Sequence, residues 1–384
     1  MRLLPGEYAV RNLLRDPSRL LQLLLGTALV VVLLLAAGAF SGGMRSALGG
    51  SGDAANVILL GAGSEGSVER SSLDPATAGV VAASVDGLRD AGGQPAVSPE
   101  IAHMTLVGPP DGALRQAMIR GITPMAFAVH RGARIIAGRL PSGDELLVGR
   151  LAHRRLGLSA EAMQPGATLV IEGRAFTVSG IFAAPDTVFE GELWADLSAL
   201  MAATRRTTIS TVVVACASAT LDDLETFTLL RLDLELVAIS EAAYYADRGR
   251  FFAPIRAMAW LTALLIAGGA IFGGLNTFHA AFAARSREAA TVQAIGFPRR
   301  AVLISFLHEA FIVSLIGTLV AVLIALLLID GRAVDVPGGT FALVLDLRTL
   351  AVGVVVGLSL GPVGALLPAW RCLTPPVPAA LRSG

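Results

Sequence analysis

The stretch "LLQLLLGTALVVVLLLAAGAF", residues 20–40, contains no charged side chain. A helix needs about 20 predominantly apolar residues to cross the hydrocarbon core of a bilayer, and this stretch is long enough. Its apolar core exceeds the roughly 7–15 residues of a cleaved signal peptide, although the small residues at its end leave that alternative open. The stretch therefore predicts a first transmembrane helix.

Three further stretches have the same character. Residues 257–284 and 349–370 contain no Asp, Glu or Arg, and residues 301–329 contain a single carboxylate, Glu309. Over the whole chain, 54% of residues are hydrophobic and 16% are charged, whereas soluble domains carry about 25% charged residues. The sequence predicts an α-helical membrane protein with four transmembrane helices.

Composition also limits the chemistry of the chain. The net charge is zero, which gives no indication of a nucleic-acid partner. All 30 basic residues are arginine, and a P-loop needs a lysine to contact the nucleotide phosphates, so the chain itself is not expected to be an ATPase or another enzyme. Cys216 and Cys372 are predicted on opposite sides of the membrane, where they cannot form a disulfide.

Arginine in the short flanking segments predicts the orientation. Residues 1–19, 285–300 and 371–384 are rich in arginine, whereas aspartates balance the arginines of residues 330–348. Short cytoplasmic segments carry the excess of positive charge. We therefore expect both terminal segments and the 285–300 loop in the cytoplasm, with 330–348 as a short extracytoplasmic loop. Residues 41–256 then form a large extracytoplasmic domain between the first and second helices.

Residues 41–256 combine strand and helix patterns and predict an α+β domain. Residues 75–93 are expected to form a helix, with Asp74 as its cap and Gly92 and Gly93 as its end. A second helix is expected over 197–206. The predicted strands are NVILL (56–60), LLVG (146–149), TLVIEG (168–173), FTVSGIF (176–182) and STVVVACA (210–217).

Two motifs have the residue spacing of enzyme signatures but lack the surrounding secondary structure that those signatures require. Gly61, Gly63 and Gly66 have the spacing of a dinucleotide-binding turn, but no helix opens directly after them, and a nicotinamide cofactor is not expected outside the cytoplasm. A flexible loop is the better interpretation. The G-x-S-x-G pattern of residues 357–361 lies inside the fourth predicted span, where an esterase elbow cannot form.

The histidines of residues 41–256 do not form a metal-binding pattern. His103, His130 and His153 are dispersed, so solvated or capping side chains are expected in place of a metal site. No Ser/His/Asp arrangement follows from the spacing. The domain is therefore expected to bind a partner or change shape.

The most informative stretch is "ARSREAATVQAIGFPRRAVLISFLHEAFIVSLIG", residues 284–317. Residues 289–295 predict a short helix that stops at Gly296, and Pro298 can begin the next helix. Arg285, Arg287 and Glu288 precede the short helix where the chain leaves the membrane. Two interpretations remain: an arginine-rich hairpin, or a helix presented to a cytoplasmic partner.

This stretch resembles the FtsX-like permease domain of ABC transporters. The pattern R-x-x-E followed by A-I-G is carried by Arg285, Glu288, Ala294, Ile295 and Gly296. The resemblance extends to "YAVRNLLRDPSRLLQLLLG" near the N-terminus and, more weakly, to "IRGI" and "GRAFTVSGIF" in the large domain. The closing motif of the family matches Pro368, Trp370, Arg371, Leu381 and Arg382. Gln293 departs from the arginine often found there, and Pro376 and Ala379 stand where acidic residues are usual.

One span, a large domain and three further spans is the plan of the MacB and lipoprotein-releasing permeases of the bacterial cytoplasmic membrane. The resemblance implies mechanotransmission: a separate ATPase subunit, which binds ATP and Mg, moves the extracytoplasmic domain through residues 285–296. No cofactor is implied for this chain. It also implies a second permease protomer, identical or related, and leaves open a periplasmic adaptor. The substrate could be a lipoprotein, a lipid, a peptide or a drug. The alternative is an FtsX-like regulator that activates a cell-wall hydrolase.

Polar and small residues within the spans complete the candidate site. Glu309 can lie at the cytoplasmic interface because its helix is longer than the bilayer requires, with His279 and His308 at the same level. A structural cluster is favoured over a proton path or a contact with the partner. Small residues at every fourth position allow close helix packing, within the chain or between protomers; they are Gly269, Gly273, Gly353, Gly357 and Gly361.

Overall fold

The computed structural model describes residues 11–336 and 339–377. The chain divides into two compact units. The helical unit comprises Met1–Gly42, Ala253–Arg332 and Leu343–Gly384. The inserted domain comprises Gly43–Phe252 and the short segment Ala333–Ala342.

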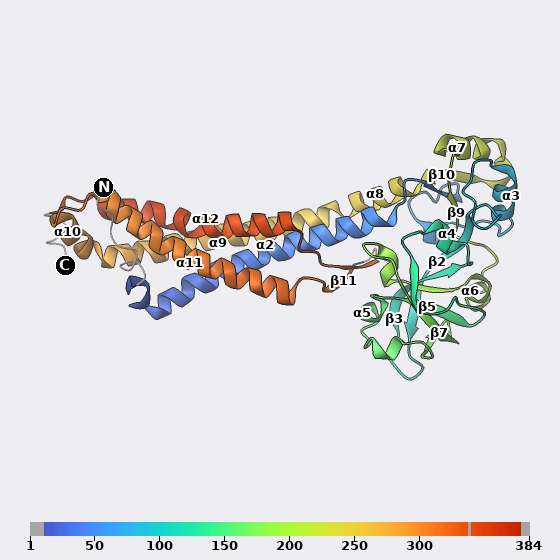
Figure 1. The fold of residues 1–384 in the computed structure, drawn as a ribbon, viewed down its shortest axis with the longest axis horizontal. Coiled ribbons are helices and arrows are strands. Elements are labelled where there is room, and N and C mark those ends of the chain that lie inside the picture. The colour runs from blue at the N-terminus through green and yellow to red at the C-terminus, as the bar shows by residue number, and fades with distance from the viewer. Residues whose placement is uncertain (1–10, 337–338, 378–384) are drawn as a thin grey trace. The chain divides into compact units, whose positions relative to one another are not determined.

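Four long helices, drawn in Figure 1, make up most of the helical unit. Each is long and apolar enough to cross a membrane. Three of them contain a whole predicted span, and α11 ends one residue before the predicted end at residue 329. The first continues well beyond residue 40, so that its last turns belong to the inserted domain. The helices are α2 (Pro17–Ser51), α9 (Ala253–Ala284), α11 (Arg299–Leu328) and α12 (Leu347–Leu373).

The glycines of α12 allow its close packing against α2 and α11. A Cβ added to Gly361 would lie 2.2 Å from Ser314 Oγ and 2.3 Å from the carbonyl oxygen of Ala310. A Cβ at Gly357 would lie 2.3 Å from the Thr318 hydroxyl, and one at Gly353 would lie 2.5 Å from the Leu35 side chain. These glycines therefore pack within the chain.

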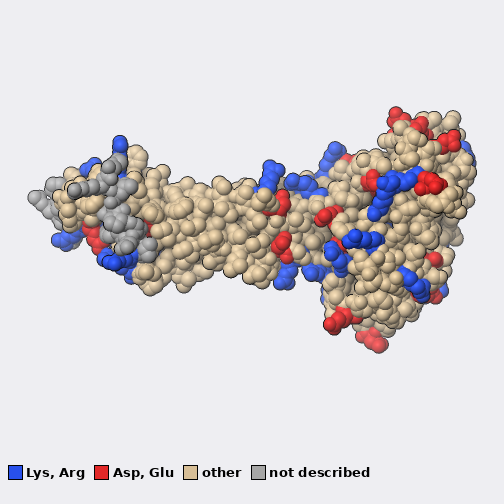
Figure 2. Space-filling model, viewed as in Figure 1, with Lys and Arg blue, Asp and Glu red and all other residues tan. Residues whose placement is uncertain are grey.

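The surface of the helical unit follows the same apolar pattern. Figure 2 shows that the middle of the helices carries no charged side chain on the face in view, whereas charged side chains gather near α10. Exposed leucines along α9, α11 and α12 account for this uncharged band. Such a band is typical of helices that contact lipid.

A ten-stranded mixed sheet forms the centre of the inserted domain. Its strand order is β10-β1-β9-β2-β3-β8-β5-β7-β4, and β6 pairs with β2 and β7. The strands are β1 (Asn56–Gly61), β2 (Val97–Gly108), β3 (Arg115–Ile122), β4 (Arg134–Gly138), β5 (Glu145–Gly149), β6 (Thr168–Ile171), β7 (Arg174–Ala183), β8 (Leu193–Asp196), β9 (Thr211–Ala215) and β10 (Leu236–Ser240). The helices are α3 (Thr77–Ser84), α4 (Ala126–Val129), α5 (Ala152–Arg155), α6 (Leu197–Thr204), α7 (Leu221–Leu230) and α8 (Glu241–Phe251). The added segment forms a hairpin of β11 (Ala333–Val336) and β12 (Gly339–Ala342).

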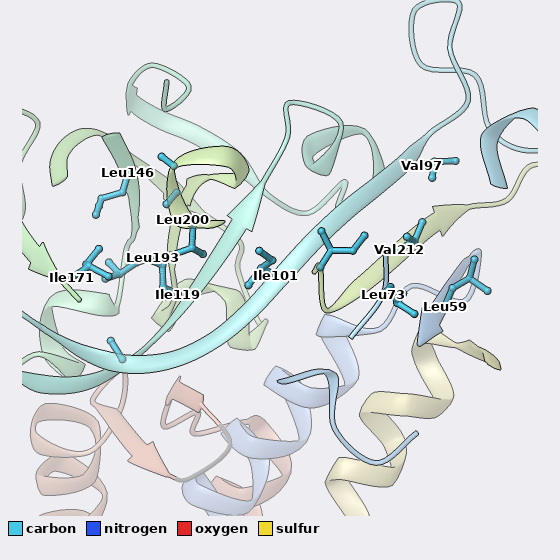
Figure 3. Packing of buried hydrophobic residues seen from close by; sticks show 14 of the residues in the cluster. Leu59, Leu73, Val97, Ile101, Ile119, Leu146, Ile171, Leu193, Leu200 and Val212 are labelled. Atoms are coloured by element: carbon cyan, nitrogen blue, oxygen red, sulfur yellow. The ribbon is translucent and has the colours of Figure 1, made fainter. Parts of the chain in front are cut away.

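Strand β2 joins the two halves of this sheet. One half contains β10, β1 and β9, and the other contains β3, β8, β5, β7 and β4. Residues Val97 to Glu100 of β2 pair with β9, and its residues Ile101 to Val107 pair with β3. Figure 3 shows the long strand between buried side chains of both halves. The apolar core is therefore continuous from Leu59 in β1 to Ile171 in β6, and Glu100 lies where the pairing changes.

One predicted helix is much shorter in the structure. Residues 75–93 were expected to be helical, but α3 ends at Ser84. Val85 is extended and Gly87 has a φ of +78°. The carbonyl of Gly87 accepts hydrogen bonds from the backbone N–H groups of residues 217, 218 and 219. These contacts with a distant segment hold residues 85–93 in turns and isolated β-bridges, which local propensity does not reveal.

The glycine motif after β1 forms a turn. Residues 62–66 lead to a single turn of 3₁₀ helix, Val68–Arg70, and no α-helix opens at Gly66. The sequence analysis also missed β2, β3, β4, β8 and β10. Pro99, Glu100 and His103 obscure the pattern of β2, which pairs with β9, β3 and β6.

Candidate functional site

The short helix α10 (Ser286–Ala294) connects α9 to α11. It begins three residues before the predicted start at Ala289 and ends before Gly296, which has a φ of +105°. This backbone conformation favours glycine because a Cβ would be strained there. Pro298 then occupies the N-cap position of α11.

One side of α10 packs on the ends of the long helices. Ala289 and Ala290 are buried, and Ala289 belongs to a cluster that includes Phe282 of α9 and Phe306 of α11. The rings of these two phenylalanines stack with centroids 4.3 Å apart. Small alanines allow the short helix to lie close to the aromatic side chains, and α10 is thereby placed firmly on the bundle.

An ion pair secures the start of α10. Arg285 Nη2 donates to Glu309 Oε2 at 2.6 Å, and both side chains are largely buried. The Arg285 guanidinium also lies over the Phe306 ring, 5.5 Å from its centroid. Removing one member of a buried pair leaves the other charge without compensation. The pair therefore joins the end of α9 to α11.

The other side of α10 is exposed. Arg287, Thr291, Ala294 and Ile295 lie at helical spacing on this side, and the Ile295 side chain is 73% exposed. Glu288 is also exposed and contacts Arg15 Nη1 at 3.3 Å. Exposed pairs of this kind contribute little to stability, so Glu288 remains available for other contacts.

The other predicted site residues of the helical unit lie outside α10. His279 and His308 occupy exposed positions on α9 and α11, and the side-chain partner of Glu309 is Arg285. In the closing motif, Pro368 is buried, whereas Trp370 and Arg371 are exposed. Leu381 and Arg382 lie outside the described residues.

A second buried polar cluster lies in the inserted domain, and the sequence analysis did not identify it. Arg120 of β3 donates two hydrogen bonds of 2.8 Å to Glu192, and its Nη1 donates to Glu100 Oε2 at 2.9 Å. His130 Nε2 lies 2.8 Å from Glu100 Oε1, and its Nδ1 lies 3.6 Å from Glu241 Oε1. We call these five residues the charge cluster.

The position of His130 corrects the expectation of a solvated side chain. His130 is the C-cap residue of α4, but only 6% of it is exposed. Its ring lies between Glu100 and Glu241 and tilts against Phe189 at 4.9 Å. His153 is exposed, and His103 lies 3.5 Å from Glu172. Residues far apart in the sequence form the charge cluster, so spacing could not reveal it.

The protonation of the charge cluster depends on these contacts. Burial alone would raise the pKa of Glu100, but His130 and Arg120 outweigh burial and lower this pKa to about 2. Burial alone would lower the pKa of His130, but Glu100 and then Glu241 raise it above its ordinary value. Burial raises the pKa of Glu241, although the charge of His130 acts against it.

Two family models match the chain. The MacB-like periplasmic core domain matches residues 20–226, more than half of the chain, and the FtsX-like permease C-terminal domain matches residues 260–377. None of the curated proteins compared with the chain matches it.

Solved structures similar to the chain cover mainly the inserted domain. The periplasmic region of MacB from Actinobacillus actinomycetemcomitans is 14% identical, with a TM-score of 0.39, and the match covers 52% of this chain and 94% of that one. The extracellular domain of the ABC-type transporter YknZ from Gram-positive bacteria is 13% identical, with a TM-score of 0.37, over 48% and 99% of the two chains. Because these scores are low, the assignment rests on the family models.

Four long apolar helices with a large domain between the first and second agree with the plan of the family that both models describe. The chain belongs to the FtsX-like permeases of ABC transporters that carry a MacB-like periplasmic core domain. This family supplies the permease component and not the ATPase, and its members in general work with an ABC ATPase and as dimers.

Proposed function

We propose that this chain is the permease subunit that couples ATP hydrolysis by a separate ATPase subunit to movement of the inserted domain. The movement drives export or extraction of a lipoprotein, lipid, peptide or drug. In this proposal the chain lies in the bacterial cytoplasmic membrane. Both terminal segments and α10 face the cytoplasm, and the inserted domain lies outside it.

The structure of α10 carries the proposal. Its buried side packs on α9 and α11, and the Arg285–Glu309 pair secures its start. Its exposed side presents Arg287, Thr291 and Ile295. A partner that pushes this side would move the ends of α9 and α11 together, because α10 is firmly placed on both.

The coupling test uses purified chain reconstituted with its ATPase subunit, isolated by pull-down from the native membrane in mild detergent. Gly296→Ala should lower the permease-dependent stimulation of ATP hydrolysis at least about threefold, because alanine strains the backbone at the end of α10 by roughly 1 kcal/mol. Glu288→Gln should lower the stimulation less. If both variants keep wild-type stimulation, α10 is not the coupling element.

Gly166→Ala is the matched control. Gly166 has a φ of +95°, and no described atom lies within 4 Å of an added Cβ, as at Gly296. Alanine should therefore cause similar local strain in the inserted domain without affecting coupling. If Gly166→Ala lowers the stimulation as much as Gly296→Ala, the effect is general strain.

The pull-down also separates the two functions. An ATP-binding subunit in roughly equal amount supports the transporter, and a second permease would identify a heterodimer. A cell-wall hydrolase in its place supports the regulator.

A membrane-impermeant thiol reagent tests the orientation of the chain in the membrane. Cys216 is a poor reporter because it is buried, which raises the pKa of its thiol; Gly66→Cys provides an exposed one.

A further inference from the structure

The charge cluster connects three parts of the inserted domain. Glu100 lies where β2 changes its pairing from β9 to β3. Arg120 and Glu192 belong to the half of the sheet that contains β3 and β8. Glu241 is the first residue of α8, and its Oε2 accepts hydrogen bonds from Asn56 Nδ2 at 2.9 Å and from the Asp53 backbone N–H at 3.0 Å.

His130 is the central member of this connection. Its two ring nitrogens face two different carboxylates, at 2.8 Å and 3.6 Å. A protonated ring donates from both nitrogens, whereas a neutral ring donates from only one. The 2.8 Å contact with Glu100 is a hydrogen bond, whereas the 3.6 Å contact with Glu241 is an ion pair that requires a charged ring. Loss of the proton therefore removes the attraction to Glu241. The shorter contact favours retention of the bond to Glu100.

Loss of the contact between His130 and Glu241 affects the start of helix α8. Helix α8 begins at Glu241 and ends at Phe251, and α9 begins at Ala253. Asp53, which donates to Glu241, follows the end of α2 at Ser51. Glu241 therefore accepts a hydrogen bond from the segment that follows α2, and it is the first residue of the helix that precedes α9.

We propose that His130 is a proton-operated latch that holds the start of α8 on the sheet. With the proton bound, His130 joins Glu100 to Glu241. Without it, the start of α8 is released from β2. A pocket of about 330 Å³, lined by His130, Glu241 and Asn56, adjoins the latch and gives protons a route to it. A role of this latch in transport rests on the proposed function, whereas the latch itself involves residues of the inserted domain alone.

The sign of the pH dependence follows from the charge cluster. His130 and Glu241 both have raised pKa values in the folded chain, so both bind protons more tightly when folded. Their contribution to stability is present at acidic pH and is lost as pH rises through the raised values. Glu100, with a pKa of about 2, stays ionised from pH 6 to 8.5. The charged and titratable groups around His130 are Glu100, Arg120, Glu192, Glu241, Tyr245, Asp53 and Arg131.

Hydrogen exchange of the full chain in detergent, without ATPase, tests the latch. After correction for the intrinsic pH dependence of exchange, the opening equilibrium of α8 should rise at least about threefold from pH 6 to pH 8.5, because the ion pair between His130 and Glu241 is lost as His130 gives up its proton. Glu241→Gln removes the carboxylate and keeps the shape of the side chain. In this variant, α8 should open readily at all these pH values, and its pH dependence should be lost.

Glu69→Gln is the matched control, because Glu69 pairs with Arg248 of the same helix at 3.4 Å and does not contact His130. Its α8 should keep the wild-type pH dependence. Constant protection of wild-type α8 between pH 6 and 8.5 would refute the latch, as would an unchanged pH dependence in Glu241→Gln. Neither result bears on ATPase stimulation, so the latch and the proposed function can fail separately.

Discussion

Helices α12 and α9 both carry glycines four residues apart, but they use them differently. On α12, Gly353, Gly357 and Gly361 lie where a Cβ would clash with α2 or α11. On α9, no described atom lies within 4 Å of a Cβ added to Gly269 or Gly273. Small-residue spacing permits close packing, but it does not determine whether a neighbouring helix uses it.

Alanines, and not glycines, form the packed face of α9. Ala263 and Ala267 are buried against Val30 and Leu34 of α2. Gly273 instead lines a cavity of about 200 Å³ within the helical unit, together with Gln22 and Ser314. Gly269 and Gly273 of α9 therefore make no close helix contact within the described residues.

The largest effect is expected at Gly361. Gly361→Ala should lower the free energy of unfolding by about 3 kcal/mol, the upper end of overpacking effects, because the carbonyl of Ala310 is backbone and cannot rotate away. Unfolding in mixed detergent micelles, followed by tryptophan fluorescence, measures this. Gly364→Ala is the control on the same helix, since its Cβ would lie an ordinary 3.7 Å from Phe278. Equal losses in the two variants would contradict the close packing of Gly361.

A smaller effect is expected where α9 ends. Because the glycines of α9 make no close contacts in the described chain, the Arg285–Glu309 pair should be important in holding this end. Glu309→Gln should cost about 2 kcal/mol, less than a fully buried pair because Arg285 can extend toward water. The unfolding assay should show that Arg285→Ala lowers the free energy of unfolding less in the Glu309→Gln variant than in the wild-type chain. Additive losses would mean that the two side chains act independently.

The smallest effect is expected on the open face of α9. Gly269→Ala and Gly273→Ala should each change the free energy of unfolding of the monomeric chain by less than about 0.5 kcal/mol, because nothing is displaced and alanine is the better helix former. The same assay measures it at detergent concentrations that keep the chain monomeric. A loss comparable to that of Gly361→Ala would show that α9 packs as closely as α12.

Local pattern was sufficient for some elements of the inserted domain. The predicted strand NVILL is β1, and residues 197–204 of the second predicted helix form α6, whose N-cap Asp196 accepts two backbone hydrogen bonds. Residues 75–93 were predicted poorly because Gly87 is held by residues 217–219. Propensity within a short window cannot include a partner more than a hundred positions away.

The sequence by itself determined that one apolar segment precedes a large domain of strands and helices and that three apolar segments follow it, because each apolar segment meets the length requirement without any partner. It also determined the family, since the A-I-G motif and its surroundings are contiguous. Only the tertiary structure decided which glycines pack, that Arg285 pairs with Glu309, and that His130 lies between Glu100 and Glu241. These features join residues distant in the chain, and their energies come from burial and geometry that exist only after folding.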